Sequence, residues 1–454
     1  MKENTSGNSL GDKLALAGFI LALCFLSALG GMALWATETF PYQVVRDGVT
    51  TLKSLFPADA AKDGDGTAPI HAKHNLNPIR FRQHGTLVHE RERVAPGLTI
   101  LTSFWRDTGW RPGVRLVDID GEVLHRWEVR PRRIWPFKDF PLGTYVHGSY
   151  LFPNGDLLVN VEYAGLARMD ACGKILWKSD FATHHSVYRD EDGNFWVSGH
   201  HRIEKGDERA ERFPPIHPPF GEDTLIKVSP QGELLEEISL LEAFYESPWK
   251  HLLWNYNVVR KPGSQDPLHL NDVETLSREL ADDFPTLDAG DIVVSPRTLN
   301  AIAILNPKGD LKWVMAGEFT QQHDPDFEPG GRIVVFDNRY DLTPKKGNFL
   351  GGSRITAIDP AANEVEDLYN SRIGDKIFYS VAAGKHQLLE NGNRLITEAK
   401  SGRIFEVTPA GETVWEWINE PYNEKKVFEV LEGTRYAGIT RQMTEAWPCS
   451  EKTE

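Results

Sequence analysis

A short pattern of alternating apolar residues around a turn recurs along the chain. Each copy has an apolar run, a turn rich in Asp, Asn, Ser, Thr, Pro and Gly, and a second apolar run that often ends in Trp. Alternation on both sides of a turn is typical of a β-hairpin. A hairpin repeated at intervals of roughly 40 to 50 residues indicates a propeller. The six copies are VRLVDIDGEVLHRW from Val114, LARMDACGKILWKS from Leu166, LIKVSPQGELLEEI from Leu225, IAILNPKGDLKWVM from Ile302, ITAIDPAANEVEDL from Ile355 and IFEVTPAGETVWEW from Ile404.

A second pair of strands precedes each of the last five hairpins. Two hairpins per repeat make a four-stranded blade, and the first blade begins near Gly97. We therefore expect an all-β protein with a six-bladed β-propeller at residues 86–425 and a C-terminal extension at residues 426–454. One insertion, residues 241–257, has a helical pattern. The five added strand pairs begin at His147, His184, His269, His323 and His386.

Residues 14–36 form an uncharged apolar stretch, and no other stretch of the chain is like it. As a helix it is long enough for the roughly 30 Å hydrocarbon core of a bilayer. Lys2 and Lys13 precede it, whereas the next basic residue after it is Arg46. The positive-inside rule then places residues 1–13 in the cytoplasm and the bulk of the chain outside. We expect a transmembrane anchor.

The alternative for this stretch is a signal peptide cleaved at Ala28-Leu29-Gly30. The stretch is longer than the usual signal-peptide core of about 7 to 15 residues, which favours the anchor. With either interpretation the large domain is exported. Residues 37–85 show no sustained periodicity, so we interpret them as a linker.

Composition limits the possible partners. The 454 residues carry 50 Lys and Arg against 65 Asp and Glu, a net charge of −15. Nucleic-acid binding depends on clustered positive charge, so we expect no nucleic-acid partner. Cys24 lies in the apolar stretch, while Cys172 and Cys449 lie in the exported part. These two form a disulfide in an oxidising compartment or remain unrelated thiols; the sequence leaves both open.

Histidines recur where the inner strands begin. The first strand of each propeller blade lines the central channel, so residues at the same position of successive inner strands meet in one ring. A single propeller histidine often only braces a neighbouring strand, but five in register favour a functional site. The first blade has no clear equivalent, and His89 is a weak candidate for it. The five positions are His147, His185 or its neighbour His184, His269, His323 and His386.

Other polar residues stand beside these histidines. Asn271 is two residues after His269 and so shares its strand face. Asn338 and Arg339 follow the apolar run RIVVF, and Arg297 follows DIVVS. A guanidinium beside several imidazoles is typical of an anion-binding site. The alternative for Arg297 is a surface salt bridge.

An ordered set of motifs resembles a known family. The motifs are His269-Leu270-Asn271, Ser295-Pro296-Arg297, Gln322-His323 ahead of Phe336-Asp337-Asn338, and Asn391-Gly392-Asn393. Together they resemble the bacterial arylsulfate sulfotransferases, exported propeller enzymes that move a sulfuryl group between phenols without phosphoadenosine phosphosulfate. The resemblance covers about 340 residues. Typical members are soluble periplasmic proteins, whereas this chain has the apolar stretch at 14–36 and His386 ahead of Gln387, so it resembles a divergent, membrane-anchored branch. With the resemblance, the predicted anchor is a single pass through the bacterial inner membrane and the propeller is periplasmic.

The resemblance implies roles for the ring residues. His323 would be the nucleophile that becomes sulfurylated, and His269, Arg297, His185 and Asn271 would hold the oxygens of the sulfate and the phenol. The other substrate-binding candidates are His147, His184, His386, Asn338 and Arg339. The substrates would be an aryl sulfate and a phenol, the kinetics would be ping-pong, and no cofactor or metal ligand is assigned. No oligomeric state follows from the sequence.

Two other functions remain open. Several imidazoles facing one channel are a possible zinc or copper site, although Arg297 would repel a cation. A propeller is also a common non-catalytic binding scaffold, here one that would hold a partner near the membrane.

Overall fold

The computed structural model describes residues 75–138, 144–214, 216–254, 266–341, 347, 349–374 and 378–449, with residues 18, 19, 21–23 and 25–27 near the N-terminus. The chain forms two compact units, residues 1–65 and 66–454. The described N-terminal residues are helical. None of the helices in these ranges has both the length and the apolar character needed to cross a membrane. The rest of the expected anchor, the tail at 1–13 and most of the linker lie outside the described residues, so the anchor stays a prediction.

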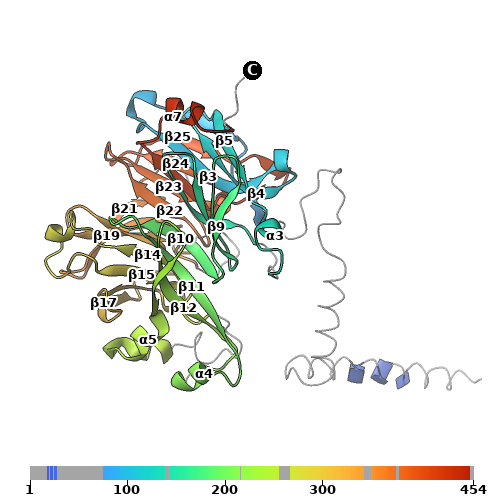
Figure 1. The fold of residues 1–454 in the computed structure, drawn as a ribbon, viewed down its shortest axis with the longest axis vertical. Helices are drawn as coiled ribbons and strands as arrows, with labels where there is room; N and C mark the ends of the chain where they lie inside the picture. Colours follow the sequence, from blue (N-terminus) through green and yellow to red (C-terminus); the bar gives the residue numbers. More distant parts are fainter. Residues whose placement is uncertain are drawn as a thin grey trace, which may run out of the picture. The chain divides into compact units, whose positions relative to one another are not determined.

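The second unit consists mainly of antiparallel sheets that follow one another along the chain (Figure 1). Six sheets of four or five strands are present in its described part, as the hairpin repeats predict. In spatial order the first three are β28 (Glu432–Tyr436), β3 (Leu98–Trp105), β4 (Arg111–Val117) and β5 (Val123–Glu128); β6 (Val146–Leu151), β7 (Leu157–Val161), β8 (Gly165–Met169) and β9 (Ile175–Lys178); and β10 (Thr183–Arg189), β11 (Phe195–Ile203), β12 (Phe220–Val228) and β13 (Leu234–Ser239).

The next three sheets repeat the same order. Each of the six predicted hairpins supplies the third and fourth strands of its sheet. The strands are β14 (Leu270–Thr275), β15 (Ile292–Pro296), β16 (Ala301–Leu305) and β17 (Leu311–Ala316); β18 (His323–Glu328), β19 (Arg332–Asp337), β20 (Arg354–Asp359) and β21 (Glu364–Asn370); and β22 (Lys385–Leu388), β23 (Arg394–Glu398), β24 (Arg403–Val407) and β25 (Thr413–Ile418), to which β2 (Gly85–Val88) adds a fifth strand.

The inner strands of the six sheets contact one another in a ring, in the order β28, β6, β10, β14, β18, β22 and back to β28. Apolar clusters fill each of the six spaces between neighbouring sheets. Ile304 and Phe284, for example, are fully or almost fully buried between the fourth and fifth sheets. Burying one such side chain stabilises the fold by about 1.5 to 3 kcal/mol. The expected all-β class is confirmed, and the arrangement is propeller-like.

The structure moves both predicted boundaries of the sheet domain. Strand β28 pairs antiparallel with β3, with Glu432 opposite Thr102, so the predicted extension at 426–454 supplies the inner strand of the first sheet. At the other end, residues from the predicted linker form β1 (Leu76–Pro78), which joins β26 (Pro421–Asn423) and β27 (Lys426–Phe428) in a small sheet. Strands near the C-terminal end of the unit therefore pair with strands near its N-terminal end, both in the first sheet and in the small sheet.

Short helices occupy the connections. The predicted helical insertion contains α5 (Leu240–Tyr245) and the 3₁₀ helix η5 (Pro248–Trp254). Ser239 caps α5 by accepting a hydrogen bond from the backbone N–H of Glu242 at 3.1 Å. The other helices in the described part of this unit are α3 (Pro131–Ile134), α4 (Glu208–Arg212), α7 (Arg441–Glu445), and the 3₁₀ helices η3 (Arg91–Arg93), η4 (Arg106–Thr108), η6 (Ala281–Asp283), η7 (Arg297–Leu299) and η8 (Ala399–Ser401).

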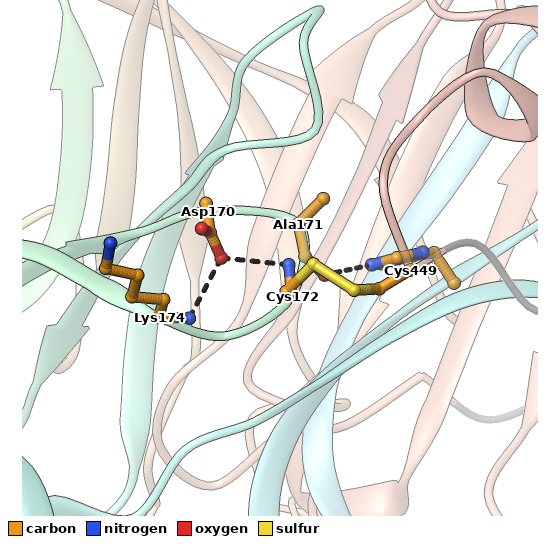
Figure 2. Close-up of a disulfide and its surroundings, with 6 residues drawn as sticks. Asp170, Ala171, Cys172, Lys174 and Cys449 are labelled. Carbon is orange, nitrogen blue, oxygen red and sulfur yellow. Dashed lines mark hydrogen bonds between the residues drawn. A yellow bond between two sulfur atoms is a disulfide. The ribbon is translucent and has the colours of Figure 1, made fainter.

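Cys172 and Cys449 form a disulfide (Figure 2), which answers a question that the sequence leaves open. Cys172 lies in the turn between β8 and β9, and Asp170 accepts a hydrogen bond from its backbone N–H at 2.9 Å. Cys449 follows α7. The bond therefore ties the chain end beyond β28 to the second sheet, across a sequence separation of 277 residues.

Replacing Cys172 by serine is expected to lower the free energy of unfolding by about 2 to 5 kcal/mol, because the long loop that the disulfide closes restricts the unfolded chain. Denaturant unfolding of the oxidised protein and of Cys172→Ser measures the difference. Cys449→Ser should give the same loss, and the double variant no further loss. A double variant that loses about the sum of both would contradict a single shared bond.

Candidate functional site

Irregularities in four inner strands direct histidines toward one place. Each of the strands β6, β10, β14 and β18 has a histidine at or next to its first residues. The register with the next strand shifts at or just after that histidine. His185 and His269 have positive φ angles of 61° and 52°. A β-bulge bends a strand and re-aims a side chain. Here it brings the rings together: the ring centre of His185 lies 4.2 Å from that of His147, 4.8 Å from that of His269 and 6.4 Å from that of His323.

His386 lies apart from this ring, contrary to its predicted place. Strand β22 pairs with β23 in regular register, without a bulge. The His386 side chain is therefore directed between sheets, where Nε2 hydrogen-bonds the carbonyl of Val334 at 3.1 Å and Nδ1 accepts from Arg394 at 3.0 Å. Arg394 also pairs with Glu328. His386 is thus a bracing residue of the kind that single propeller histidines often are.

Asn338 fixes the orientation of His323. Its amide nitrogen donates to the carbonyls of Ser380 and Ala383 at 2.9 and 2.8 Å, so its Oδ1 faces His323 Nδ1 at 2.6 Å. Nδ1 consequently carries the proton, and Nε2 has the free electron pair. The backbone N–H of Ala383 approaches Nε2 at a longer 3.3 Å. Burial and the charge of Arg297 hold the pKa of His323 well below its usual value, so the imidazole is neutral.

Arg297 lies in the site rather than in a surface salt bridge. It begins η7 directly after β15, and its backbone N–H donates to the carbonyl of His269 at 3.2 Å. Its Nε is buried and has no hydrogen-bond partner among the described residues. Burial lowers the pKa of Arg297, although the negative charge of Asp266 opposes this. A buried guanidinium with an unused donor is suited to an anionic ligand.

His269 is held by a carboxylate. Its Nδ1 contacts Asp266 Oδ2, and its backbone N–H donates to Asp266 Oδ1 at 2.9 Å. A carboxylate on Nδ1 fixes the tautomer, with the proton on Nδ1. Nε2 is then the atom of His269 that can exchange a proton with a ligand.

A second carboxylate serves the neighbouring histidines. Glu162 accepts from His147 Nδ1 at 2.8 Å and from the backbone N–H of His185 at 3.3 Å. Burial alone would raise the pKa of Glu162, but the charge and hydrogen bond of His147 outweigh it and lower the pKa to about 2. His184 Nδ1 lies 2.6 Å from His185 Nδ1. Burial, followed by the charge of His147, lowers the pKa of His185 well below its usual value.

Two other predicted residues have different positions. Asn271 donates through Nδ2 to the carbonyl of Gln322 at 2.7 Å, so this amide N–H positions β18 and is not available to a sulfate oxygen. Arg339 is partly buried, with a positive φ of 50°. Among the described residues no contact of its guanidinium with the histidine ring is recorded; its backbone N–H donates to Asp337 at 3.1 Å.

The sequence of this chain matches a known family. The family model described as arylsulfotransferase (ASST) covers residues 149–420, more than half of the chain. The chain belongs to the arylsulfotransferase family. The match begins two residues after His147 and contains His185, His269, Arg297 and His323.

The solved structures that resemble this chain share little sequence identity with it. A Bacteroides caccae protein of unknown function is 12% identical, over 71% of this chain and 93% of that one, with a TM-score of 0.45. A streptogramin B lyase is 12% identical over 77% and 89%, with a TM-score of 0.38. The WD40 propeller domain of Doa1 is 10% identical over 76% and 88%, with a TM-score of 0.38. No curated protein matches.

Sequence reasoning missed several residues of this site. Glu162 and Tyr163 follow β7, Asp266 stands three residues before His269, and Tyr145 stands two residues before His147. The rings of Tyr145 and His147 lie 5.4 Å apart, and Tyr163 stacks on His184 at 5.3 Å. The available signal was position, since Tyr145 and Asp266 precede inner strands with a candidate histidine, and Glu162 and Tyr163 follow the strand that pairs with the strand of His147.

Proposed function

We propose that this arylsulfotransferase transfers a sulfuryl group from an aryl sulfate ester to a phenol through a sulfohistidine at His323. The observation that carries the proposal is the pair formed by His323 and Arg297. The imidazole of His323 is neutral, and Asn338 holds its Nδ1–H, so the nucleophilic electron pair is on Nε2. The guanidinium of Arg297, whose charge adds to burial in lowering the pKa of His323, has an unused donor at its buried Nε. Nucleophile and anion-binding group thus occupy one site.

In the first half-reaction His323 Nε2 attacks sulfur. The N–S bond forms as the bond between sulfur and the phenolic oxygen breaks, and the phenol leaves with a proton from His269, whose imidazolium form Asp266 stabilises. The guanidinium of Arg297 and the ring N–H of His185 donate to the sulfuryl oxygens, which carry the developing charge. In the second half-reaction His269 takes the proton of an acceptor phenol, whose oxygen attacks sulfur and frees His323.

We also propose the setting of this reaction. The closed order of inner strands and of apolar clusters supports a complete six-bladed propeller with β28 as its last-joined strand. The apolar stretch at 14–36 and the disulfide between Cys172 and Cys449 support export, with a single-pass anchor in the bacterial inner membrane and a periplasmic catalytic domain.

Incubation of the purified protein with 4-nitrophenyl sulfate tests the proposal. Without an acceptor, nitrophenol release should stop after about one equivalent per enzyme; further turnover should require an added phenol, and the sulfated acceptor should then appear in equal amount. Double-reciprocal plots at several acceptor concentrations should be parallel, as for ping-pong kinetics. Continued release over many turnovers without an acceptor would instead indicate a sulfatase, and no release with a panel of phenols would refute the proposal.

The pH dependence of the first half-reaction follows from the low pKa of His323. A nucleophile whose pKa lies well below 6.5 stays neutral at pH 6. We expect the burst rate of nitrophenol release to show no loss from protonation of the nucleophile between pH 8 and pH 6. Stopped-flow bursts across this range measure it. A tenfold fall with a midpoint near pH 6.5, unchanged in Asp266→Asn, would contradict the depressed pKa of His323.

A further inference from the structure

His184, His200 and Asp223 form a compact group on the third sheet, on the far side of His184 from His185. Their ligand atoms all lie within 4.8 Å of one another. They come from the adjacent strands β10, β11 and β12, and His200 is directly opposite Asp223 in the register. Three donors on neighbouring strands of one sheet are positioned by the backbone ladder rather than by a loop, which is the support that a precise site needs.

The distances within this group are longer than those of short charge-assisted hydrogen bonds. Asp223 Oδ1 lies 3.3 Å from His184 Nε2 and 3.4 Å from His200 Nδ1. Charge-assisted hydrogen bonds between nitrogen and oxygen are shorter, about 2.7 to 2.9 Å. Ligands bound to Zn²⁺ at about 2.0 to 2.2 Å in a tetrahedron lie about 3.3 to 3.6 Å from one another. The separations therefore match two edges of a zinc tetrahedron.

We propose that His184 Nε2, His200 Nδ1 and Asp223 Oδ1 bind a divalent transition-metal ion, with Zn²⁺ as the favoured ion. Two imidazoles and one carboxylate are a common zinc ligand set, with a water at the fourth position. The site adds a metal to a protein for which the sequence assigned none. Its ligands are not the groups proposed to carry out sulfuryl transfer at His323, and the two sites are linked through the contact between His184 and His185.

The surroundings complete the ligand geometry. The second oxygen of Asp223 accepts from the backbone N–H of Leu270 at 2.9 Å. The other nitrogen of His184, Nδ1, lies 2.6 Å from Nδ1 of His185. A metal on Nε2 makes His184 Nδ1–H a stronger donor, and such a partner is what metal-bound histidines use to fix their orientation. The metal thereby sets the tautomer of His185, whose remaining N–H is at Nε2.

Access is through His200. Its side chain is 17% exposed, whereas the side chains of His184 and Asp223 are completely buried. The rings of His184 and His200 are almost perpendicular, at 89° with centres 5.8 Å apart, and Tyr163 packs against both. An ion can reach the group from the His200 side and is then shielded by the Tyr163 ring.

The two similar groups in the described residues already have a cation nearby. In the group of His147, Glu162 and His185, the His147–Glu162 contact is an ordinary 2.8 Å hydrogen bond, and Glu162 interacts electrostatically with Arg297. In the group of Asp324, Asp326 and His386, Arg394 occupies His386 Nδ1 and Lys385 lies 3.9 Å from Asp324. Arginine and lysine would repel a metal ion at both places.

Metal analysis of the full chain tests the proposal. After expression with added zinc and extensive dialysis, the wild type should retain about one ion per chain, and His200→Ala and Asp223→Asn less than about one tenth. The matched control is His201→Ala, one residue away, whose imidazole instead contacts Glu237 at the surface; it should keep the ion. Replacement by Co²⁺ should give the intense visible absorption of a tetrahedral site, absent from His200→Ala.

The outcomes are distinct. Iron or copper at the same stoichiometry, lost in the same two variants, supports the site and assigns its ion. A metal-free wild type, or equal metal in wild type and His200→Ala, overturns the proposal and leaves a His184–Asp223 ion pair. Circular dichroism and the unfolding midpoint of each variant show whether metal loss comes from misfolding. Because metal content is measured without any aryl sulfate, this test can fail while the sulfotransferase proposal stands, and the reverse.

Discussion

Replacing His323 by alanine is expected to lower kcat/KM for an aryl sulfate by on the order of 10⁴-fold or more, because the group proposed to form the covalent intermediate is removed. Nδ1–H of His323 is held by the uncharged amide oxygen of Asn338, so the electron pair is on Nε2. His269 and His147 instead contact carboxylates through Nδ1, those of Asp266 and Glu162. Initial rates with 4-nitrophenyl sulfate and a phenol measure the loss.

The intermediate itself provides a second measurement. Wild-type protein mixed with the donor alone should gain the mass of one SO₃ group on the peptide that contains His323, and His323→Ala should gain none. His251→Ala is the control, since His251 is exposed on η5, where its Nδ1 hydrogen-bonds the carbonyl of Pro248 at 3.2 Å; it should retain both the rate and the adduct. A His323→Ala protein within tenfold of the wild-type rate would show that another nucleophile acts.

Most of the sheet pattern could be predicted because it is local. The turn and its flanking apolar alternation lie within about 14 residues, so each hairpin identifies itself. The partner of β3 could not be found this way, because β28 lies more than 300 residues away and is a short strand, Glu432–Tyr436, with a single aromatic residue. Closure of the ring depends on pairing that no local pattern encodes.

The histidine ring was predictable only in part for a similar reason. Their place at the start of an inner strand put His147, His269, His323 and His386 in one class, but a strand position fixes the face only when the backbone is regular. Bulges turn the first three toward the channel, whereas regular pairing turns His386 toward Arg394. The carboxylates Glu162 and Asp266 were missed because carboxylates are common at strand ends, and nothing in their spacing marks them.

The charge of the site differs from that of the whole chain. A protein with a net charge of −15 must bind an anionic ester through local positive potential. Two histidines of the ring do not supply that potential, because the pKa values of His323 and His185 are both depressed and their imidazoles are neutral. Arg297 is therefore the permanent positive charge beside the nucleophile, and its loss cannot be made good by the histidines without changing their protonation.

Replacing Arg297 by alanine is expected to lower kcat/KM for the aryl sulfate by about 10²- to 10³-fold, the usual effect of removing one preorganised donor from a developing anion. Arg297→Lys should recover only part of the loss, because an ammonium has one compact charge and cannot donate as a planar fork. Because Nε of Arg297 has no hydrogen-bond partner among the described residues, we expect added guanidinium ions to restore part of the activity of the alanine variant.

The same substitution should alter the pH profile, which separates a direct role from a structural one. Burial first, and the charge of Arg297 second, lower the pKa of His323. Removing that charge raises the pKa only part of the way toward the usual value near 6.5, because burial remains. The burst rate of Arg297→Ala should therefore begin to fall at a higher pH than that of the wild type. Arg297→Lys keeps the positive charge and should keep the wild-type profile. Identical profiles in Arg297→Ala and the wild type would show that burial alone sets the pKa of His323 and would contradict an effect of the guanidinium charge on the nucleophile.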